Sequence, residues 1–405
     1  MSIRIAAPMS AGFMMVSAAS AAMASADVNT VVADVMADAS TRSSLSLQSA
    51  ASGYDDGFVI RDQSDDFELS ISGWTQIRYT FAHARNATGG DDANESGFSL
   101  RRTRLTVQGS LYDGAFGFKL TNSFSRTSGA GRLSDAYVTA RLSERAEVRF
   151  GQFKLPFARE ELTSAKRLIA TDRSIVNDVF GQGRSQGVEL SIEHDNVRIG
   201  LAYSDGFDSA NTDFDTAPAE WAVTGRIEWL AMGAWRAFRE FSSPRGAEYS
   251  VLFGLAGNIE ETPSTLGSPT TLQTSWTVDG GVEGPGFHVF ASASGRFTDG
   301  SSGDFFDMGA LIQSSVFVTN DIEPFARFDV VIPDSSRPGD DPFRTLTLGA
   351  NWYVHGQAVK LTLDGQWFFD DVAGNDLIRP NTAQGILAGA DAGSFAIRAQ
   401  FQLVF

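Results

Sequence analysis

The chain has 405 residues, no cysteine and a formal net charge of −17. The lack of cysteine excludes a disulfide framework and thiolate chemistry, and the acidic balance argues against binding to nucleic acid. Phe and Gly are frequent, at 31 and 40 residues, although the mean hydropathy is only −0.10. This combination is typical of strands that alternate outward apolar with inward polar side chains.

The N-terminal 26 residues are expected to form a secretory signal peptide. Arg4 supplies positive charge, a small apolar run follows at 11–24, and Ala24-Ser25-Ala26 fits the small-x-small cleavage rule. The alternative is a transmembrane anchor, but the run is too short and too rich in Ala and Ser. Residues 27–66 are expected to be a short periplasmic leader without a core. No later segment offers the apolar run of a membrane-spanning helix.

From Phe67 onward, apolar and polar residues alternate with a period of two. Alternation over about ten residues is the signal of a transmembrane β-strand, although one soluble strand gives the same local pattern. The alternation predicts 16 strands, an even number, as a closed barrel with both ends in the periplasm needs. The predicted strands are 67–82, 98–110, 114–125, 133–143, 145–153, 185–194, 196–204, 220–230, 247–258, 273–283, 286–297, 305–317, 322–331, 343–353, 357–369 and 393–405.

The connections between these strands alternate in length. Tight turns such as Leu111-Tyr112-Asp113 are followed by long loops rich in Gly and Asp, which is the asymmetry of outer-membrane barrels. Residues 231–246 break this rule, since a short turn is expected there. By strand order, 154–184 is the third long loop. The predicted long loops are 83–97, 154–184, 205–219, 259–272, 298–304, 332–342 and 370–392.

The final strand has the clearest pattern. An apolar row ends at Phe405, whereas Arg398, Gln400 and Gln402 form the opposite face. A last strand that ends in an aromatic residue resembles the signal read by the barrel assembly machinery, so Phe405 is the candidate assembly residue. The alternative is an edge strand of a soluble sandwich, but such an apolar edge would invite aggregation.

Charge is unevenly distributed along the chain. Acids concentrate in the long loops, where solvation is the simplest explanation and binding of divalent cations the alternative. Of the 32 basic residues only four are Lys, and Arg holds planar anions with a fixed fork. The face predicted to line the lumen carries more bases than acids, which would favour anions. These bases could instead pair with facing acids in the wall. They include Arg78, Arg102, Arg104, Lys119 and Arg141.

Several motifs occur in the same order as in one known family. They are Gly73-Trp74-Thr75-Gln76, Arg101-Arg102-Thr103-Arg104-Leu105, Ser134-Asp135-Ala136-Tyr137, Gly151-Gln152-Phe153-Lys154-Leu155-Pro156-Phe157 and Glu160-Glu161-Leu162-Thr163-Ser164. The chain resembles the phosphate-selective porin O and P family, most strongly over 54–205. The resemblance implies a 16-stranded barrel, commonly trimeric, whose third long loop folds into the lumen and whose path is lined by basic side chains.

The sequence therefore predicts an all-β outer-membrane barrel of Gram-negative type, 67–405, with an inward-folded third extracellular loop. We expect passive diffusion of small, phosphate-like anions, outer-membrane lipid around a homotrimer, and no enzyme activity, metal or cofactor. The alternatives are a non-selective or sugar-passing porin and a structural or adhesive surface barrel. The candidate anion-binding residues are Lys154, Arg159, Lys166, Arg167, Arg173 and Arg184 in the loop, and Arg78, Arg102, Arg104, Lys119 and Arg141 on the wall.

Overall fold

The computed structural model describes residues 50–54, 57–62, 66–88, 90–262, 270–300 and 303–405. The predicted signal peptide and most of the predicted leader lie outside the described residues. The chain divides into two compact units, 1–51 and 52–405, and the second contains the barrel. Within the described ranges, no helix is long and apolar enough to cross a membrane.

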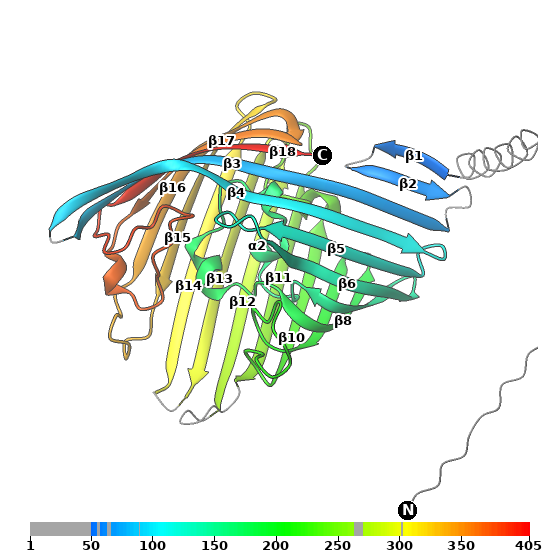
Figure 1. Cartoon of the computed structure of the whole chain (residues 1–405), viewed down its shortest axis with the longest axis horizontal. Helices are drawn as coiled ribbons and strands as arrows, with labels where there is room; N and C mark the ends of the chain where they lie inside the picture. Colours follow the sequence, from blue (N-terminus) through cyan, green and yellow to red (C-terminus); the bar gives the residue numbers. More distant parts are fainter. Residues whose placement is uncertain (1–49, 55–56, 63–65, 89, 263–269, 301–302) are drawn as a thin grey trace, which may run out of the picture. The chain divides into compact units, whose positions relative to one another are not determined.

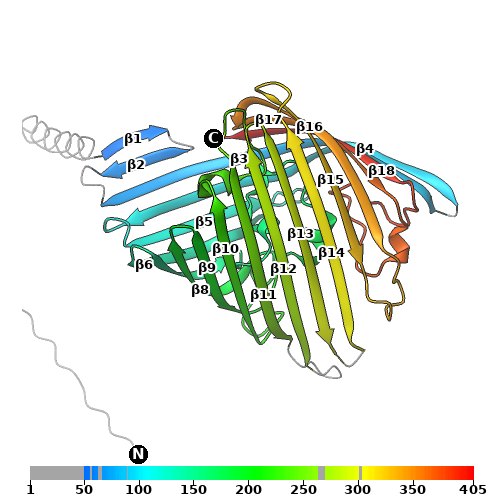
Figure 2. The same ribbon diagram turned by 180° about the vertical axis from the view of Figure 1, so that it is seen from behind.

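Sixteen strands, β3 to β18, form one closed antiparallel barrel (Figures 1 and 2). Each strand pairs with the next along the chain, and β18 closes the circle by pairing with β3. The prediction of a 16-stranded barrel is confirmed. The strands are β3 (Phe67–Thr88), β4 (Asp91–Leu111), β5 (Phe116–Phe124), β6 (Gly131–Ser143), β7 (Ala146–Phe153), β8 (Ser185–His194), β9 (Val197–Ser204), β10 (Trp221–Met232), β11 (Ser250–Thr262), β12 (Thr271–Gly284), β13 (Phe287–Asp299), β14 (Phe305–Val316), β15 (Ile322–Ile332), β16 (Phe343–Gln357), β17 (Val359–Phe368) and β18 (Phe395–Val404).

The barrel places its apolar side chains outside and its polar side chains inside. In β18, Ile397 is 43% exposed while its neighbour Arg398 is fully buried. An apolar outer face suits a barrel that is surrounded by lipid. Because the strands pair in a closed circle, their backbone N–H and C=O groups are hydrogen-bonded within the barrel. The chain end closes the seam, since the Phe405 backbone N–H and carbonyl pair with Gly73 at 2.8 and 2.6 Å.

Two short strands precede the barrel and were not predicted. β1 (Ala50–Tyr54) pairs with β2 (Phe58–Asp62), and β2 pairs with the start of β3. β3 begins several residues before the point where β18 ends, so its first residues would otherwise be an open edge. β2 covers that edge, which removes a site for unwanted strand pairing.

The prediction of a loop at 83–97 is wrong. β3 and β4 continue pairing to Thr88 and Asp91, well past their other neighbours, as a long hairpin (Figure 1). The extension is held by the connection from β17 to β18: Asp391 N–H donates to the Arg85 carbonyl at 3.1 Å, and Asn86 donates to the Asp391 carboxylate at 2.8 Å. Support from a distant loop explains why local sequence did not show it.

The connection from β10 to β11 folds back instead of turning, as its unusual length indicated. Gly233 begins it with φ of 90°, and a Cβ there would lie 2.0 Å from the Ser250 hydroxyl, so only glycine fits. The segment then forms a 3-10 helix, η2 (Trp235–Arg239). We call residues 233–249 the turn segment. Phe238 and Phe241 of this segment are buried.

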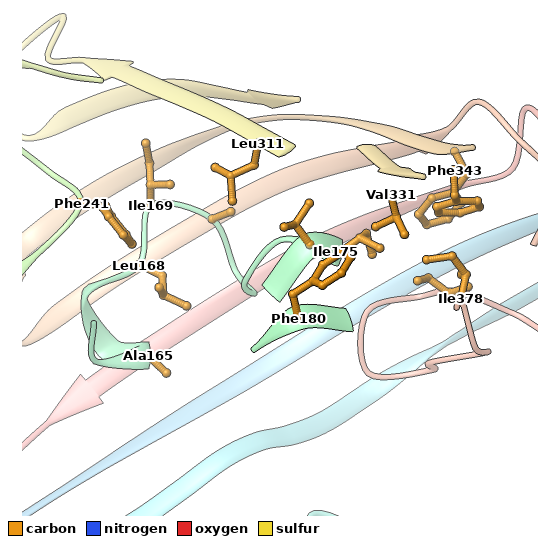
Figure 3. Close-up of a cluster of buried hydrophobic side chains, with 14 of the residues drawn as sticks. Ala165, Leu168, Ile169, Ile175, Phe180, Phe241, Leu311, Val331, Phe343 and Ile378 are labelled. Atoms are coloured by element: carbon orange, nitrogen blue, oxygen red, sulfur yellow. The ribbon is translucent and has the colours of Figure 1, made fainter. Parts of the chain in front are cut away.

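The turn segment meets the third long loop in one hydrophobic cluster (Figure 3). Phe241 belongs to the same cluster as Leu168 and Ile169 of the loop and Leu311 of the wall, and its ring centroid lies 4.8 Å from that of Phe290. The cluster continues to Phe343 and to residues of the connection between β17 and β18, which includes the 3-10 helix η3 (Val372–Gly374). Apolar packing therefore joins the loop, the turn segment and the connection between β17 and β18 to strands β13 to β18 and to β3.

Candidate functional site

Loop 154–184 contains three short helical turns: α2 (Arg159–Leu162), the 3-10 helix η1 (Ala165–Arg167) and α3 (Ile175–Phe180). The Ser174 hydroxyl caps α3 by accepting the Asn177 N–H at 3.0 Å. The Glu160 carboxylate accepts from both the N–H and the hydroxyl of Ser174, at 2.8 and 2.5 Å. These contacts tie the two ends of the loop to each other, which gives it a fixed shape without a core of its own.

Asp172 anchors this loop to the wall. Its carboxylate pairs with Arg78, with Arg101 at 2.9 Å and with Arg102 at 2.7 Å. Burial alone would raise the pKa of Asp172, but the three guanidinium groups outweigh it and hold that pKa well below its usual range. One buried acid therefore holds two predicted site residues, Arg78 and Arg102, together with Arg101, and offsets one of their three positive charges.

Other wall arginines are paired in the same way. Arg398 pairs with Asp364 at 2.7 Å, Arg327 with Asp329 at 3.2 Å, and Arg226 with Asp279 at 2.8 Å. Arg327 also donates to the Asp172 carbonyl at 2.9 Å. These bases belong to buried networks that hold the loop and the wall together, so they offer little free charge to a solute.

The opposite side of the barrel holds a cavity of about 410 Å³ with a different charge balance. Its walls are β3 to β7 and the loop, and we call it the basic compartment. Six basic residues and one acid, Asp135, line it. The six are Arg104, Lys119, Arg149, Lys154, Lys166 and Arg184. Five of these are predicted candidates, and Arg149 is the addition that the candidate set lacked.

The positive charge of the basic compartment is only partly compensated. Arg184 pairs with Asp135 at 2.8 Å. Arg104 lies over the Trp74 ring at 5.4 Å, and its Nε has no hydrogen-bond partner within the described chain. Lys119 forms no hydrogen bond or close ion pair with described residues. Asp135 attracts it, and Arg149, Arg184 and Arg104 are near enough to repel it.

Lys154 and Glu161 form the boundary between the compartment and the loop. The Lys154 ammonium donates to the Glu161 carbonyl and lies 3.5 Å from its carboxylate. Burial lowers the pKa of Lys154 well below its usual value, and Arg173 and Arg184 lower it further, while Glu161 opposes them. Burial would raise the pKa of Glu161, but Arg173 and Lys154 bring it down to about 2. Glu161 is therefore ionised and structural.

The remaining predicted candidates lie elsewhere. Arg159 pairs with Glu228 at 2.9 Å and donates to the Phe238 carbonyl, so it ties the loop to the turn segment. Arg173 donates to the carbonyls of Glu160 and Thr163 inside the loop. The Arg167 carbonyl accepts the Phe241 N–H at 3.2 Å. Arg141 is exposed near the turns and lines a second cavity. The structure does not bring these four into the basic compartment.

Within the described residues, no group of three or more His, Asp or Glu side chains could hold a metal ion. The acidic loops therefore show no preformed cation site in that part of the chain.

A closed 16-stranded antiparallel barrel with an apolar outer face and a polar lumen defines the class: an outer-membrane β-barrel of the porin type. The fold and the family match described next indicate a channel rather than an enzyme.

The model of the family "Phosphate-selective porin O and P" matches residues 75–245. This match confirms the resemblance over β3 to β10, the part that contains the basic compartment. In a comparison with curated proteins, no match reached significance.

Among solved structures, the fold is similar to the anion-selective porin from Comamonas acidovorans, at 16% identity over 84% of this chain and 100% of that chain, with a TM-score of 0.58. It is also similar to the outer membrane channel DcaP of Acinetobacter baumannii, at 12% identity over 86% and 99%, with a TM-score of 0.57. OmpT of Vibrio cholerae matches at 11% identity over 85% and 99%, with a TM-score of 0.55. These similarities show the fold.

Proposed function

We propose that this porin is a passive diffusion channel that prefers small anions of phosphate type. The observation that carries the proposal is the basic compartment, where six bases face one acid. A confined space in which guanidinium and ammonium groups outnumber the acids lowers the energy of an anion by replacing part of its hydration shell. The Arg forks can hold phosphate oxygens in pairs, while Lys119 acts as a point charge.

We propose that the route runs through the basic compartment because its lining is the most strongly positive. A larger cavity of about 640 Å³ beside α3, β12 and β13 is lined by three arginines (Arg296, Arg337 and Arg379) and two acids (Asp178 and Asp376). Loop 154–184 hydrogen-bonds to inward-facing side chains, such as Asn351 to the Ile169 carbonyl at 2.8 Å, and the turn segment packs against the loop. We propose that the loop folds into the lumen and narrows it, so that solutes pass beside β3 to β7. Charge on that side then determines which solutes cross.

The aromatic rings of the compartment favour an anion over a sugar. Arg104 covers the Trp74 ring, and Arg149 covers the rings of Tyr137 and Phe153 at 4.8 and 5.3 Å. A sugar would need those ring faces for stacking. The cation–π contacts instead hold the guanidinium groups in place while leaving their edges able to donate.

The assembly is proposed to be a homotrimer in outer-membrane lipid, exported by a signal peptide at 1–26. Support comes from the trimer form of OmpT of Vibrio cholerae, whose fold is similar at 12% identity. Phe405 is proposed as the residue read by the assembly machinery, and its ring packs so closely on Gly73 that a Cβ there would lie 2.7 Å away. Deletion of Phe405 should therefore impair assembly.

The proposal is tested in planar bilayers with the full chain. A reversal potential under a KCl gradient that favours chloride is expected, and inorganic phosphate should block part of the chloride current. A preference for cations would contradict the proposed anion selectivity, and the absence of any channel would contradict porin function. Chloride preference without phosphate block would limit the proposal to a general anion channel.

A further inference from the structure

A second cavity meets the basic compartment at a shared boundary. It has a volume of about 400 Å³ and lies toward the turns, and Arg149 and Lys154 line both spaces. The charges of the second cavity nearly balance, with six bases and five acids. The acids are Glu144, Glu147, Glu189, Glu193 and Glu228. An anion that passes from the basic compartment toward the turns therefore leaves a strongly positive space for a nearly neutral one.

Arg149 at this boundary faces an acid that it does not fully bind. Arg149 on β7 is the register partner of Glu189 on β8. Their closest atoms, Nη1 and Oε2, are 3.5 Å apart, and neither Arg149 Nε nor Glu189 Oε2 has a hydrogen-bond partner within the described chain. Glu189 lines the second cavity and is absent from the lining of the basic compartment.

A neighbouring acid shows what a purely structural pair looks like. Glu228 accepts hydrogen bonds from Arg226 and Arg159, both at 2.9 Å. That carboxylate is held by two guanidinium groups. Glu189 is similarly buried, at 7% exposure, yet it attracts Arg149 without a hydrogen bond. A buried charge pair with unused hydrogen-bonding groups is costly unless another partner uses them part of the time.

We infer that Glu189 is an exit residue, which competes with a permeating anion for Arg149 and so speeds its release. This inference rests on the proposed anion function. When an anion occupies the basic compartment, Arg149 can donate to it. The Glu189 carboxylate repels that anion and attracts the same guanidinium, which keeps binding weak. Conduction requires such weak binding, because a solute held too firmly would stop the current.

The test measures block of chloride current by inorganic phosphate in planar bilayers, with the full chain. Glu189→Gln removes the competing charge while keeping the shape of the side chain. The phosphate concentration for half block should fall by about threefold or more, the effect of one charge several ångströms away in a water-like dielectric, and blocked dwell times should lengthen. Asp195→Asn is the matched control, because that acid is 82% exposed at a turn and lines neither cavity.

Two further variants separate this role from a structural one. If Glu189 acts mainly by competing for Arg149, Glu189→Gln should change the phosphate block much less in an Arg149→Gln background than in the wild-type background. Should Glu189→Gln fail to assemble, Glu189→Asp draws the carboxylate back and should tighten the block to a smaller degree. Unchanged block in an assembled Glu189 variant would overturn the inference. A wild type without anion preference would overturn the proposed function itself, before any variant is compared.

Discussion

Both sides of the lumen contain basic side chains, but the two sides differ in how many acids face them. On the side of β11 to β18, Arg327 and Arg398 are buried and paired with acids. On the side of β3 to β7, six bases surround a cavity with one acid. We therefore expect selectivity to depend less on the number of arginines than on which of them are already paired with a buried carboxylate.

The side of β13 to β18 also differs from the side of β3 to β7 in its packing. Loop 154–184 and the turn segment approach it from opposite ends of the barrel and share the cluster around Phe241 and Ile169. The compartment side has no comparable apolar filling among the described residues, and hydroxyl groups such as Ser70 and Thr106 line it instead. We therefore assign passage to the side of β3 to β7, where Asp172 also anchors the loop to Arg78 of β3 and Arg102 of β4.

The largest expected effect comes from breaking the anchor. Asp172→Asn leaves the guanidinium groups of Arg78, Arg101 and Arg102 without their acid. Loss of one partner from a buried ion cluster costs about 3–5 kcal/mol. The loop should loosen, and single-channel current should become larger and noisier. Asp370→Asn is the control, because Asp370 pairs with the exposed Arg344, and ion pairs in contact with solvent contribute little to stability. Equal current noise in both variants would contradict the hypothesis that Asp172 anchors the loop to the wall.

The turn segment offers the next test. Phe241→Ala removes a buried ring from the cluster that joins the segment to the loop. Such a change costs about 3–5 kcal/mol in a rigid core, and less is expected here because the segment can relax into the lumen. Conductance should rise, since the segment no longer packs firmly. Phe214→Ala, at a position 90% exposed, should leave the conductance unchanged. The same change in both would show that the ring does not hold the segment.

Two adjacent basic residues in η1 allow a finer test of which side of the loop solutes pass. Lys166 lines the basic compartment, whereas Arg167 does not. Both charge reversals, Lys166→Glu and Arg167→Glu, should allow the barrel to assemble, and both should lower anion selectivity. The shift in reversal potential should be greater for Lys166→Glu. A greater shift for Arg167→Glu would place the path on the other side of the loop.

The smallest expected effect depends on pH. Lumen water reaches Asp178, but the surrounding protein removes much of its hydration, and Asp172 and Glu160 repel its charge, so its pKa is raised to about 7. Asp178 is neutral below that pKa and negative above it. Anion preference should therefore fall slightly as pH rises from about 6 to about 8. Asp178→Asn should flatten this dependence, whereas a dependence that persists would assign it to the histidines.

The barrel could be predicted from the sequence because apolar and polar residues alternate within each strand, so each strand can be recognised without its neighbours. The apolar row of the last strand, Ile397, Phe401 and Leu403, faces outward as its pattern indicated. The extended hairpin was missed because its partner loop is some 300 residues away in the chain. Which candidate bases are neutralised could not be predicted either. Asp172 meets Arg78 only after the loop reaches the wall, and no local pattern records that contact.

We propose that the bases of the basic compartment, and not those that contact Asp172, determine selectivity. Lys119→Gln and Arg102→Gln each remove one positive charge from the wall. Arg102 lies 2.7 Å from Asp172, an acid that it shares with Arg78 and Arg101. Lys119 lines the compartment without a close ion pair in the described chain. Under a KCl gradient, the reversal potential should move toward cation preference in Lys119→Gln and much less in Arg102→Gln. Equal shifts, or a larger shift in Arg102→Gln, would contradict the account.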